Sequence, residues 1–464
     1  MDHWYSEADG KLYFHCAKEG HKLDAISTCD KVSYCVMDQG YRKDDEWALN
    51  IRSVIIFGRM HIVEDEDMKR KICTDLCRKF TDDEAYLEKE LKNAFPRVCR
   101  LRTQSRRWLT GCKENRDKEE RMRALFIGGT GTISTAIVKK LVEDPLWEVW
   151  LLNRGNRKEA VPKGVHQIIA DINDEKAVSD KIGDMTFDAI CEFIGFTVKD
   201  VERDHRLFKD KTRQYIYTSS ASAYHKPAAN YIITEGTTLA NPYWQYSRDK
   251  IECEEFLMRK YREEGFPVTI VRPSHTYDER SIPIGVHGKN GSWQVIKRMQ
   301  EGKPVIIQGD GTSLWTLTHN SDFAIGYIGL MGNRHAIGEA FHITGDETLS
   351  WDQIYATIAD ALGVELHAYH VSSEFLSAVG DKYGYDYEGS LIGDKAVSVV
   401  FDNSKLKRVV PNMQTRVSFD RGVRIALDHI LAHPEECQRE DPEFDRWCDM
   451  VIDVLEEARS KVTL

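Results

Sequence analysis

The 464 residues of this chain exceed what one hydrophobic core usually serves, so two or more domains are expected. Residues 1–122 carry equal numbers of basic and acidic side chains, so the net charge of −11 lies wholly in the remainder, which disfavours nonspecific binding of nucleic acid there. No apolar run approaches the roughly 18 to 20 residues of a membrane helix, and no signal-peptide profile opens the chain. We therefore expect a cytoplasmic protein without a membrane span.

The first 112 residues are predicted to form mainly strands. Four segments rich in β-branched and aromatic residues are bounded by Gly, Asp or Asn, namely 11–17, 31–38, 53–63 and 97–103. One helix is expected over 65–80, where apolar residues recur every four positions from Met68 to Phe80. The basic stretch from Arg97 to Arg107 is interpreted as a solvated strand pair and turn. Residues 113–122, nearly all charged, are expected to be a linker.

The eleven cysteines indicate neither disulfides nor a metal site. They form no CxxC pair, and no secretion signal accompanies them. Cys73 and Cys77, the closest pair, lie on one face of the expected helix without a histidine or third cysteine nearby. Reduced thiols that pack against neighbouring residues are the expectation.

From residue 123 the pattern changes to apolar strands that alternate with amphipathic helices. This alternation predicts an α/β fold, with a parallel sheet that carries helices on both faces. We expect a Rossmann-type core over about 123–275 and a smaller substrate lobe over most of 276–464.

The sequence FIGGTGTIS begins this second part with a strand, a tight turn and a helix N-terminus. Gly128, Gly131 and Ser134 have the spacing of a dinucleotide-binding turn, in which backbone N–H groups and the helix dipole receive a pyrophosphate. A purely structural turn would explain the two glycines equally well. About 20 residues on, the next strand ends in Asn153 and Arg154 rather than in an acid. A guanidinium suits a 2′-phosphate, so NADP is predicted over NAD.

A serine, a tyrosine and a lysine further on predict chemistry at the cofactor. Ser220 follows a strand, and Tyr246 and Lys250 lie one helical turn apart 26 residues later. An ammonium beside a phenol favours the phenolate, and a serine hydroxyl can hold a substrate oxygen. The YxxxK spacing alone arises easily by chance on a helix surface, whereas its order after the glycine turn and the serine is more specific.

Together these motifs resemble the extended branch of the short-chain dehydrogenase/reductase superfamily, the NAD-dependent epimerase/dehydratases, over nearly all of 123–464. The resemblance implies Tyr246 as the acid/base, Lys250 as the residue that holds the nicotinamide ribose and lowers the tyrosine pKa, and Ser220 as the carbonyl partner. Asp171 near the adenine has a plain alternative as a helix N-cap, and Pro273 against the nicotinamide has one as a strand terminator. The full set of expected cofactor contacts is Gly128, Gly131, Thr132, Ile133, Asn153, Arg154, Asp171, Ile172, Gly195 and Pro273.

Two departures bear on the reaction. Sugar-nucleotide dehydratases of this branch have an acidic pair just after the catalytic Ser or Thr, whereas this chain has Ala221 and Ser222, so dehydration is disfavoured. Epimerisation or carbonyl reduction of a sugar nucleotide or a related hydroxy or keto substrate remains. His319 and Asp322 are interpreted as strand-end and helix-start residues rather than catalysts. The motifs are also similar to those of chloroplast stem-loop-binding relatives, which act on RNA.

The front of the chain resembles the FMN-binding split barrels related to pyridoxamine-phosphate oxidase, of the nitroimidazole-resistance type. The resemblance lies in the HxAxxGxK run formed by His15, Ala17, Gly20 and Lys22. It implies His15 and Lys22 near an FMN phosphate and a pairing of two subunits in a homodimer. The alternative is a hairpin with a solvated turn, and the chain begins almost at this motif, so part of the barrel is expected to be missing.

Two other functions are left open. A non-catalytic nucleotide sensor or RNA-binding protein would need the basic stretch from Arg97 to Arg107 for salt-dependent binding. A flavin–nicotinamide fusion would use NADPH to reduce FMN in the front domain.

Overall fold

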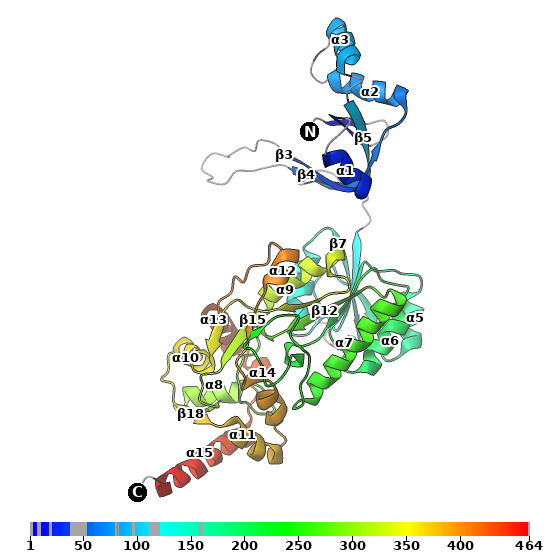
Figure 1. The fold of residues 1–464 in the computed structure, drawn as a ribbon. Helices are drawn as coiled ribbons and strands as arrows, with labels where there is room; N and C mark the ends of the chain where they lie inside the picture. Colours follow the sequence, from blue (N-terminus) through cyan, green and yellow to red (C-terminus); the bar gives the residue numbers. More distant parts are fainter. Residues whose placement is uncertain are drawn as a thin grey trace. The chain divides into compact units, whose positions relative to one another are not determined.

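The computed structural model describes residues 3–6, 11–17, 21–37, 53–78, 81, 83–94, 98–110, 121–156 and 161–462. The chain divides into two compact units, Met1–Glu119 and Glu120–Leu464, which are taken in turn below (Figure 1). The expected linker 113–122 falls almost entirely outside the described residues, and Met122 already belongs to the first strand of the second unit.

The N-terminal unit contains a five-stranded antiparallel sheet. Successive residues of a strand point to opposite faces, and here both faces are covered. Leu12 and Phe14 pack with Met60 on one face, and Tyr13 packs with Ile72 on the other. The strands in sheet order are β1 (His3–Ser6), β2 (Lys11–Ala17), β5 (Val98–Thr110), β4 (Ser53–Ile62) and β3 (Lys31–Met37).

In the described residues of this unit, three helices accompany the sheet where the sequence predicted one. The predicted helix is α2 (Glu66–Cys77), whereas α1 (His21–Thr28) and α3 (Glu84–Ala94) were missed. The expected strand pair and turn over the arginine-rich stretch is also wrong, because β5 runs unbroken and pairs with β2 and β4 on its two sides. Barrel closure stays a prediction. His15 lies in β2 and Lys22 in α1, but their side chains, and Gly20, fall outside the described part of the chain.

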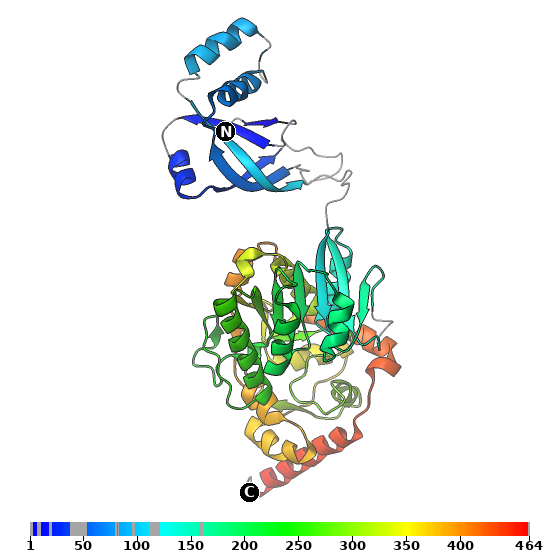
Figure 2. The same ribbon diagram turned by 90° about the vertical axis from the view of Figure 1, so that its right-hand side faces the viewer.

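The C-terminal unit is built on a seven-stranded parallel sheet, which confirms the predicted α/β class (Figure 2). Each strand is a short apolar segment, as expected for a sheet buried on both faces. The strands in sheet order are β16 (Ala340–Ile343), β12 (Val268–Pro273), β10 (Tyr215–Thr218), β9 (Ala189–Glu192), β6 (Met122–Ile127), β7 (Trp147–Asn153) and β8 (His166–Ile169).

Helices pack on both faces of this sheet through separate apolar cores. One core joins the sheet to α4 (Ser134–Val142), α9 (Asn320–Leu330) and α12 (Ser404–Val409). The other joins it to α5 (Glu175–Ile182), α6 (Val198–Phe208) and α7 (Gln245–Glu264). Because β16, α9 and α12 come after residue 275, the later part of the chain contributes to the Rossmann layers as well as to the lobe.

The lobe has its own apolar core, which includes Trp315, Trp351 and Trp447. Its strands form three small sheets: β13 (His275–Tyr277) with β15 (Leu314–His319) and β17 (Thr348–Ser350), β14 (Val305–Gln308) with β18 (Ala368–Val371), and β11 (Ile232–Ile233) with β19 (Val400–Phe401). Its helices are α8 (Trp293–Gln300), α10 (Trp351–Leu362), α11 (Ser373–Gly380), α13 (Phe419–Ala432), α14 (Pro434–Cys437), α15 (Pro442–Val462) and the π-helical segment η6 (Glu388–Lys395).

Candidate active site

The glycine turn joins β6 to α4 at the carboxyl edge of the sheet. Gly128 has a φ of 85°, and a Cβ there would lie 2.5 Å from Cγ2 of Ile194, so any side chain would force a shift. At Gly131 a Cβ would meet only Oγ of Ser134, at 3.6 Å, so the backbone there is open to a ligand. Ile133 precedes α4 without a side-chain cap. An anion such as a pyrophosphate fits this uncapped helix N-terminus.

Ser134 stands where the third glycine of such turns usually stands, and its side chain closes the turn. The buried Oγ accepts a hydrogen bond from Gly131 N at 3.0 Å and donates one to Gly128 O at 2.8 Å. The two glycines are thereby tied to each other and to the first turn of α4. This departure from the usual pattern therefore supports the binding conformation of the turn.

Asn153 and Arg154 end β7 beside the turn. Oδ1 of Asn153 accepts a hydrogen bond from Gly155 N at 2.9 Å, so this side chain shapes the strand end. Arg154 is exposed, which leaves its guanidinium free to meet a ligand at the sheet edge. The arrangement is compatible with a 2′-phosphate, and the choice between NADP and NAD stays a prediction.

Asp171 and Ile172 follow β8, and Asp171 is not a helix N-cap. The N-cap of α5 is Asp174, whose Oδ1 accepts a hydrogen bond from Ala177 N at 3.0 Å. Asp171 is exposed and Ile172 is buried beneath it. The plain alternative for Asp171 is therefore wrong. Its Oδ1 accepts a 3.0 Å hydrogen bond from Asn173 N in the turn before α5, and its place near an adenine stays a prediction.

Lys250 is buried behind the site. Its Nζ donates hydrogen bonds of 2.8 Å to the carbonyl oxygens of Gly195 and Thr218, and it lies 4.8 Å from the ring centroid of Tyr217. Burial lowers the pKa of Lys250 to about 8. The lysine thus ties the end of β10 and the loop that contains Gly195 to helix α7.

Ser220 and Tyr246 place two hydroxyl groups in one pocket. Ser220 caps the short 3₁₀ turn η3 (Ala221–Ala223), and its Oγ is 2.8 Å from Oγ of Ser222, which accepts a further 2.7 Å bond from Ser247. Tyr246 lies in the first turn of α7, and its hydroxyl is hydrogen-bonded to Ser220. The structure therefore brings together the predicted carbonyl partner and the predicted acid/base.

The expectation that Lys250 lowers the tyrosine pKa is not met. Burial raises the pKa of Tyr246, and the hydrogen bond from Ser220 offsets only part of that effect. The Lys250 ammonium lies 5.8 Å from the ring centroid of Tyr246 and is engaged by two backbone carbonyls. Desolvation therefore outweighs charge attraction here, and Tyr246 is protonated at neutral pH.

The pocket has a volume of about 320 Å³ and opens between the cofactor edge and the lobe. Pro273, the last residue of β12, lines it, so this proline both ends a strand and faces the site. The lobe supplies aromatic, histidine and charged side chains that the sequence did not single out. The lining residues are Ile133, Ser220, Ala221, Ser222, Lys226, Trp244, Tyr246, Pro273, Ser274, His275, Thr276, Trp315, Asp394, Lys395, Val399 and Phe401.

Two residues from the part of the chain after position 275 reach the glycine turn and were also missed. The Arg280 guanidinium, held by the buried carboxylate of Asp278, lies 3.4 Å from Oγ1 of Thr132. Asn320 donates a 3.1 Å hydrogen bond to the carbonyl oxygen of Thr132. Arg280 could therefore hold a cofactor phosphate at this turn. No local pattern marks it, because it lies 148 residues from Thr132.

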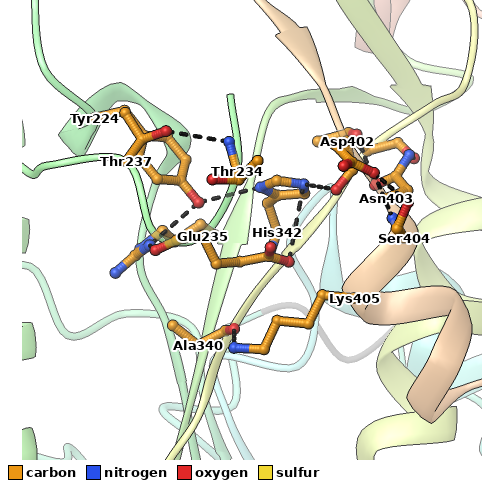
Figure 3. A network of polar contacts seen from close by, with 12 residues as sticks. Tyr224, Thr234, Glu235, Thr237, Ala340, His342, Asp402, Asn403, Ser404 and Lys405 are labelled. Atoms are coloured by element: carbon orange, nitrogen blue, oxygen red, sulfur yellow. Dashed lines mark hydrogen bonds and ion pairs between the residues drawn. The ribbon is translucent and has the colours of Figure 1, made fainter. Parts of the chain in front are cut away.

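A chain of buried hydrogen bonds fixes the strands and loops around the site. Glu254, one turn after Lys250 on α7, binds Arg272 of β12, which donates to the Tyr224 hydroxyl at 3.1 Å. Tyr224 in turn contacts Nδ1 of His342 at 3.1 Å, and Nε2 of His342 lies 2.9 Å from the carbonyl oxygen of Asp402 (Figure 3). Burial lowers the His342 pKa, so the ring is neutral and carries its proton on Nε2.

His319 and Asp322 have the structural roles predicted for them. His319 ends β15 and caps α9, and Asp322 accepts hydrogen bonds from the backbone N–H groups of Arg416 and Val417. Among the described residues, no group of three or more His, Cys, Asp or Glu side chains is arranged to hold a metal ion. None of the helices in that part of the chain is long and apolar enough to cross a membrane.

The fold is of the Rossmann type, and Ser220 and Tyr246 line a pocket in this unit. Residues 124–344 match the NAD dependent epimerase/dehydratase family. Residues 124–344 therefore form a domain of this kind, which confirms the stated resemblance over that range. With its relatives, this domain makes the chain an NAD-dependent enzyme of the oxidoreductase or isomerase type.

Two individual relatives are similar to this chain. The chain is 24% identical over 310 residues to 2′-dehydrokanamycin reductase of Streptomyces kanamyceticus, covering 67% of this chain and 85% of the relative. It is 26% identical over 252 residues to the chloroplast stem-loop binding protein of 41 kDa b of Arabidopsis thaliana, covering 52% and 63%.

Among solved structures, UDP-glucuronic acid 4-epimerase from Bacillus cereus, in complex with UDP-glucuronic acid and NAD, superposes with a TM-score of 0.53. The sequence identity is 19%, and the match covers 67% of this chain and 99% of the epimerase. This likeness shows the shared fold.

Proposed function

We propose that the C-terminal unit exchanges hydride between a nicotinamide cofactor and a hydroxyl- or keto-bearing carbon of a sugar nucleotide or related substrate. The observation that carries this proposal is the convergence on one pocket of Ser220 and Tyr246 with Ile133 and Pro273. Ile133 belongs to the cofactor turn, whereas Ser220 and Tyr246 are the groups that can handle a proton. A substrate carbon in this pocket would meet both.

The side chains divide the work at the reacting oxygen. A bound nicotinamide supplies or accepts the hydride. Tyr246, protonated at neutral pH, gives its proton to a carbonyl oxygen as that oxygen is reduced, and takes one from a hydroxyl in the reverse direction. Ser220 holds the same oxygen by a hydrogen bond. Lys250 is a positioning residue, because its Nζ fixes the carbonyls of Gly195 and Thr218.

Reduction and epimerisation need only this chemistry, whereas dehydration also needs an acid/base pair that eliminates water. The match to 2′-dehydrokanamycin reductase supports reduction, and the matched family supports epimerisation. Ala221 and Ser222 follow Ser220 where the dehydratases have acids, and both are buried.

The remaining features of the proposal concern cofactors and assembly. NADP is favoured over NAD on the strength of Arg154, which is exposed at the end of β7. The N-terminal sheet is proposed to belong to a split barrel that pairs two chains in the cytoplasm; FMN, where it binds, would lie near His15 and Lys22.

Spectroscopy of the full-length protein tests the reaction. NADPH and NADH are each mixed with a 4-keto sugar nucleotide, and UDP-glucose is incubated with each oxidised cofactor. We expect either loss of absorbance near 340 nm with the keto sugar or formation of UDP-galactose. Absence of both, with cofactor bound, would contradict the proposal. Tighter binding of NADH than of NADPH would contradict the choice of NADP.

A second candidate function is RNA binding, supported by the match to the chloroplast stem-loop binding protein. Retention of a stem-loop RNA at about 0.15 M salt, with no hydride transfer to any sugar nucleotide, would favour it.

A further inference from the structure

Two buried lysines line the pocket beside Ser220 and Tyr246. Lys226 is 2% exposed and Lys395 is 8% exposed. An ammonium group has three hydrogen-bond donors, and its burial costs several kcal/mol unless partners compensate it. The partners of these two groups therefore indicate what the pocket is built to receive.

The protein itself satisfies the two ammonium groups only weakly. Nζ of Lys226 lies 3.3 Å from the carbonyl oxygen of Asp394 and 3.8 Å from its carboxylate, and Nζ of Lys395 lies 3.3 Å from the carbonyl oxygen of Ser390. Charge-assisted hydrogen bonds are typically about 2.7 to 2.9 Å long. Burial lowers the pKa of both lysines in spite of the nearby carboxylate. The ammonium groups of Lys226 and Lys395 can therefore donate further hydrogen bonds to a ligand in the pocket.

The pocket lining has an excess of positive charge. Of the described residues that line it, Asp394 alone is acidic, and it is shared between two lysines. His275, the lining histidine, adds no charge, because burial lowers its pKa to about 3. A substrate that carries ammonium groups would be repelled here, whereas an anion would compensate the lysines.

The lysines are held in place next to the catalytic loop. Asn241 donates to the carbonyl oxygens of both Ser222 and Gly393, at 2.9 and 2.7 Å, which ties segment η6 to the turn after Ser220. Trp351 donates a 3.0 Å bond to the carbonyl oxygen of Lys395. The cations therefore share one small cavity with the reacting hydroxyls rather than lying at a distant subsite.

We infer that the substrate carries an anionic substituent, a carboxylate or a phosphate, close to the carbon that exchanges hydride, and that Lys226 and Lys395 bind it. This inference rests on the proposed function for the location of the reacting carbon. It restricts the substrate class to acidic or phosphorylated sugars and excludes amino sugars. The two lysines are specificity residues, since neither is needed for the proton transfer by Tyr246.

Binding of small probes tests the inference without any requirement for turnover. Glucose, glucuronate, glucose 6-phosphate and inorganic pyrophosphate are titrated into the full-length protein saturated with oxidised cofactor, at constant ionic strength. The fluorescence of Trp244 and Trp315, which line the pocket, reports binding. We expect one of the two anionic sugars to bind at least about tenfold more tightly than glucose, as a charge-assisted hydrogen bond predicts. The tighter of the two distinguishes a carboxylate from a phosphate.

The Lys395→Met variant should lose this preference and remain folded, because it removes a buried charge at nearly constant side-chain length. Lys226→Gln provides a second variant, and Lys461→Met, an exposed lysine on α15, is the matched control that should retain the preference. Equal binding of glucose and both anionic sugars overturns the inference, and so does the absence of binding of all three. A preference for an anionic sugar over glucose that survives both substitutions overturns it as well. Tighter binding of pyrophosphate than of either sugar assigns the lysines to a diphosphate and also overturns it. If the protein shows the preference for an anionic sugar but transfers no hydride in the spectroscopic test, only the proposed function is contradicted.

Discussion

The cofactor side and the substrate side of the site are built by different means. The cofactor side consists mainly of backbone: a glycine turn, a helix N-terminus and the ends of adjacent parallel strands. The substrate side consists of buried ionisable and aromatic side chains, among them Lys226 and Asp394, which are 168 residues apart in the chain. Backbone recognition serves a ligand shared by a whole family, whereas side chains from distant segments can change with the substrate.

The largest expected effect is that of Tyr246→Phe, which should change turnover on the substrate side but not binding on the cofactor side. Tyr246→Phe removes the proton donor and keeps the ring, so turnover should fall by about a thousandfold or more, while the cofactor dissociation constant changes less than about twofold. Steady-state rates and a cofactor titration measure the two quantities. An active Tyr246→Phe would refute the assigned mechanism.

Lys250 lies between the cofactor side and the substrate side, and its lowered pKa predicts how the stability of the protein depends on pH. Burial lowers this pKa from 10.5 to about 8. Between these values the unfolded chain holds a proton that the folded chain has released, so the stability of the wild type rises with pH through this window.

The free energy of unfolding of the wild type, measured relative to that of Lys250→Met, should therefore rise by about 3 kcal/mol between pH 8 and pH 10.5. Urea unfolding of the cofactor-free proteins at the two pH values measures the gain. Lys461→Met is the control: the difference in unfolding free energy between the wild type and this variant should not change between the two pH values. A constant difference between wild type and Lys250→Met would show that the ammonium is not desolvated.

Gly128→Ala should damage the cofactor side alone. The φ of 85° and the 2.5 Å approach to Ile194 predict a loss of stability of about 2 kcal/mol, and cofactor affinity should fall about thirtyfold as the turn shifts. Gly183→Ala shares the positive φ, at 52°, but a Cβ there meets nothing within 4 Å, so it controls for backbone strain. Equal effects of the two changes would contradict a role of the close approach.

Arg280 sharpens the comparison, because it comes from the lobe and lies on the cofactor side. Arg280→Met should weaken binding of the dinucleotide about tenfold and leave the binding of adenosine, which has no phosphate, unchanged. Calorimetry of both ligands measures the difference. Equal losses for the two would indicate that Arg280 only stabilises the fold around Thr132.

The residues of the cofactor side could be predicted from the sequence, whereas most residues of the substrate side could not. The glycine turn, the strand ends and the Tyr246–Lys250 spacing are local patterns, and the structure places all of them at one sheet edge. Lys226, Asp394 and Lys395 carry no local signal, because a lysine in an irregular segment is usually exposed. Helix α3 was missed although Asp83 accepts hydrogen bonds from the N–H groups of Ala85 and Tyr86, which is a detectable capping pattern.

The tyrosine pKa shows a second limit. Spacing places Lys250 next to Tyr246, and proximity of an ammonium argues for a lower pKa. Burial depends on the whole fold, however, and it reverses the direction of the pKa shift of Tyr246. The sequence therefore predicts that Tyr246 and Lys250 lie near each other, but it does not predict the direction of the tyrosine pKa shift.

Ser134 has a consequence for the kinetics of cofactor binding. Since its hydroxyl already joins Gly128 to Gly131, the loop needs no ordering step when the dinucleotide arrives. Conformational entropy that a flexible loop would lose on association is lost at folding instead. The association rate of the cofactor should thus be set by diffusion and charge, and differences in affinity among variants of this turn should appear in the dissociation rate.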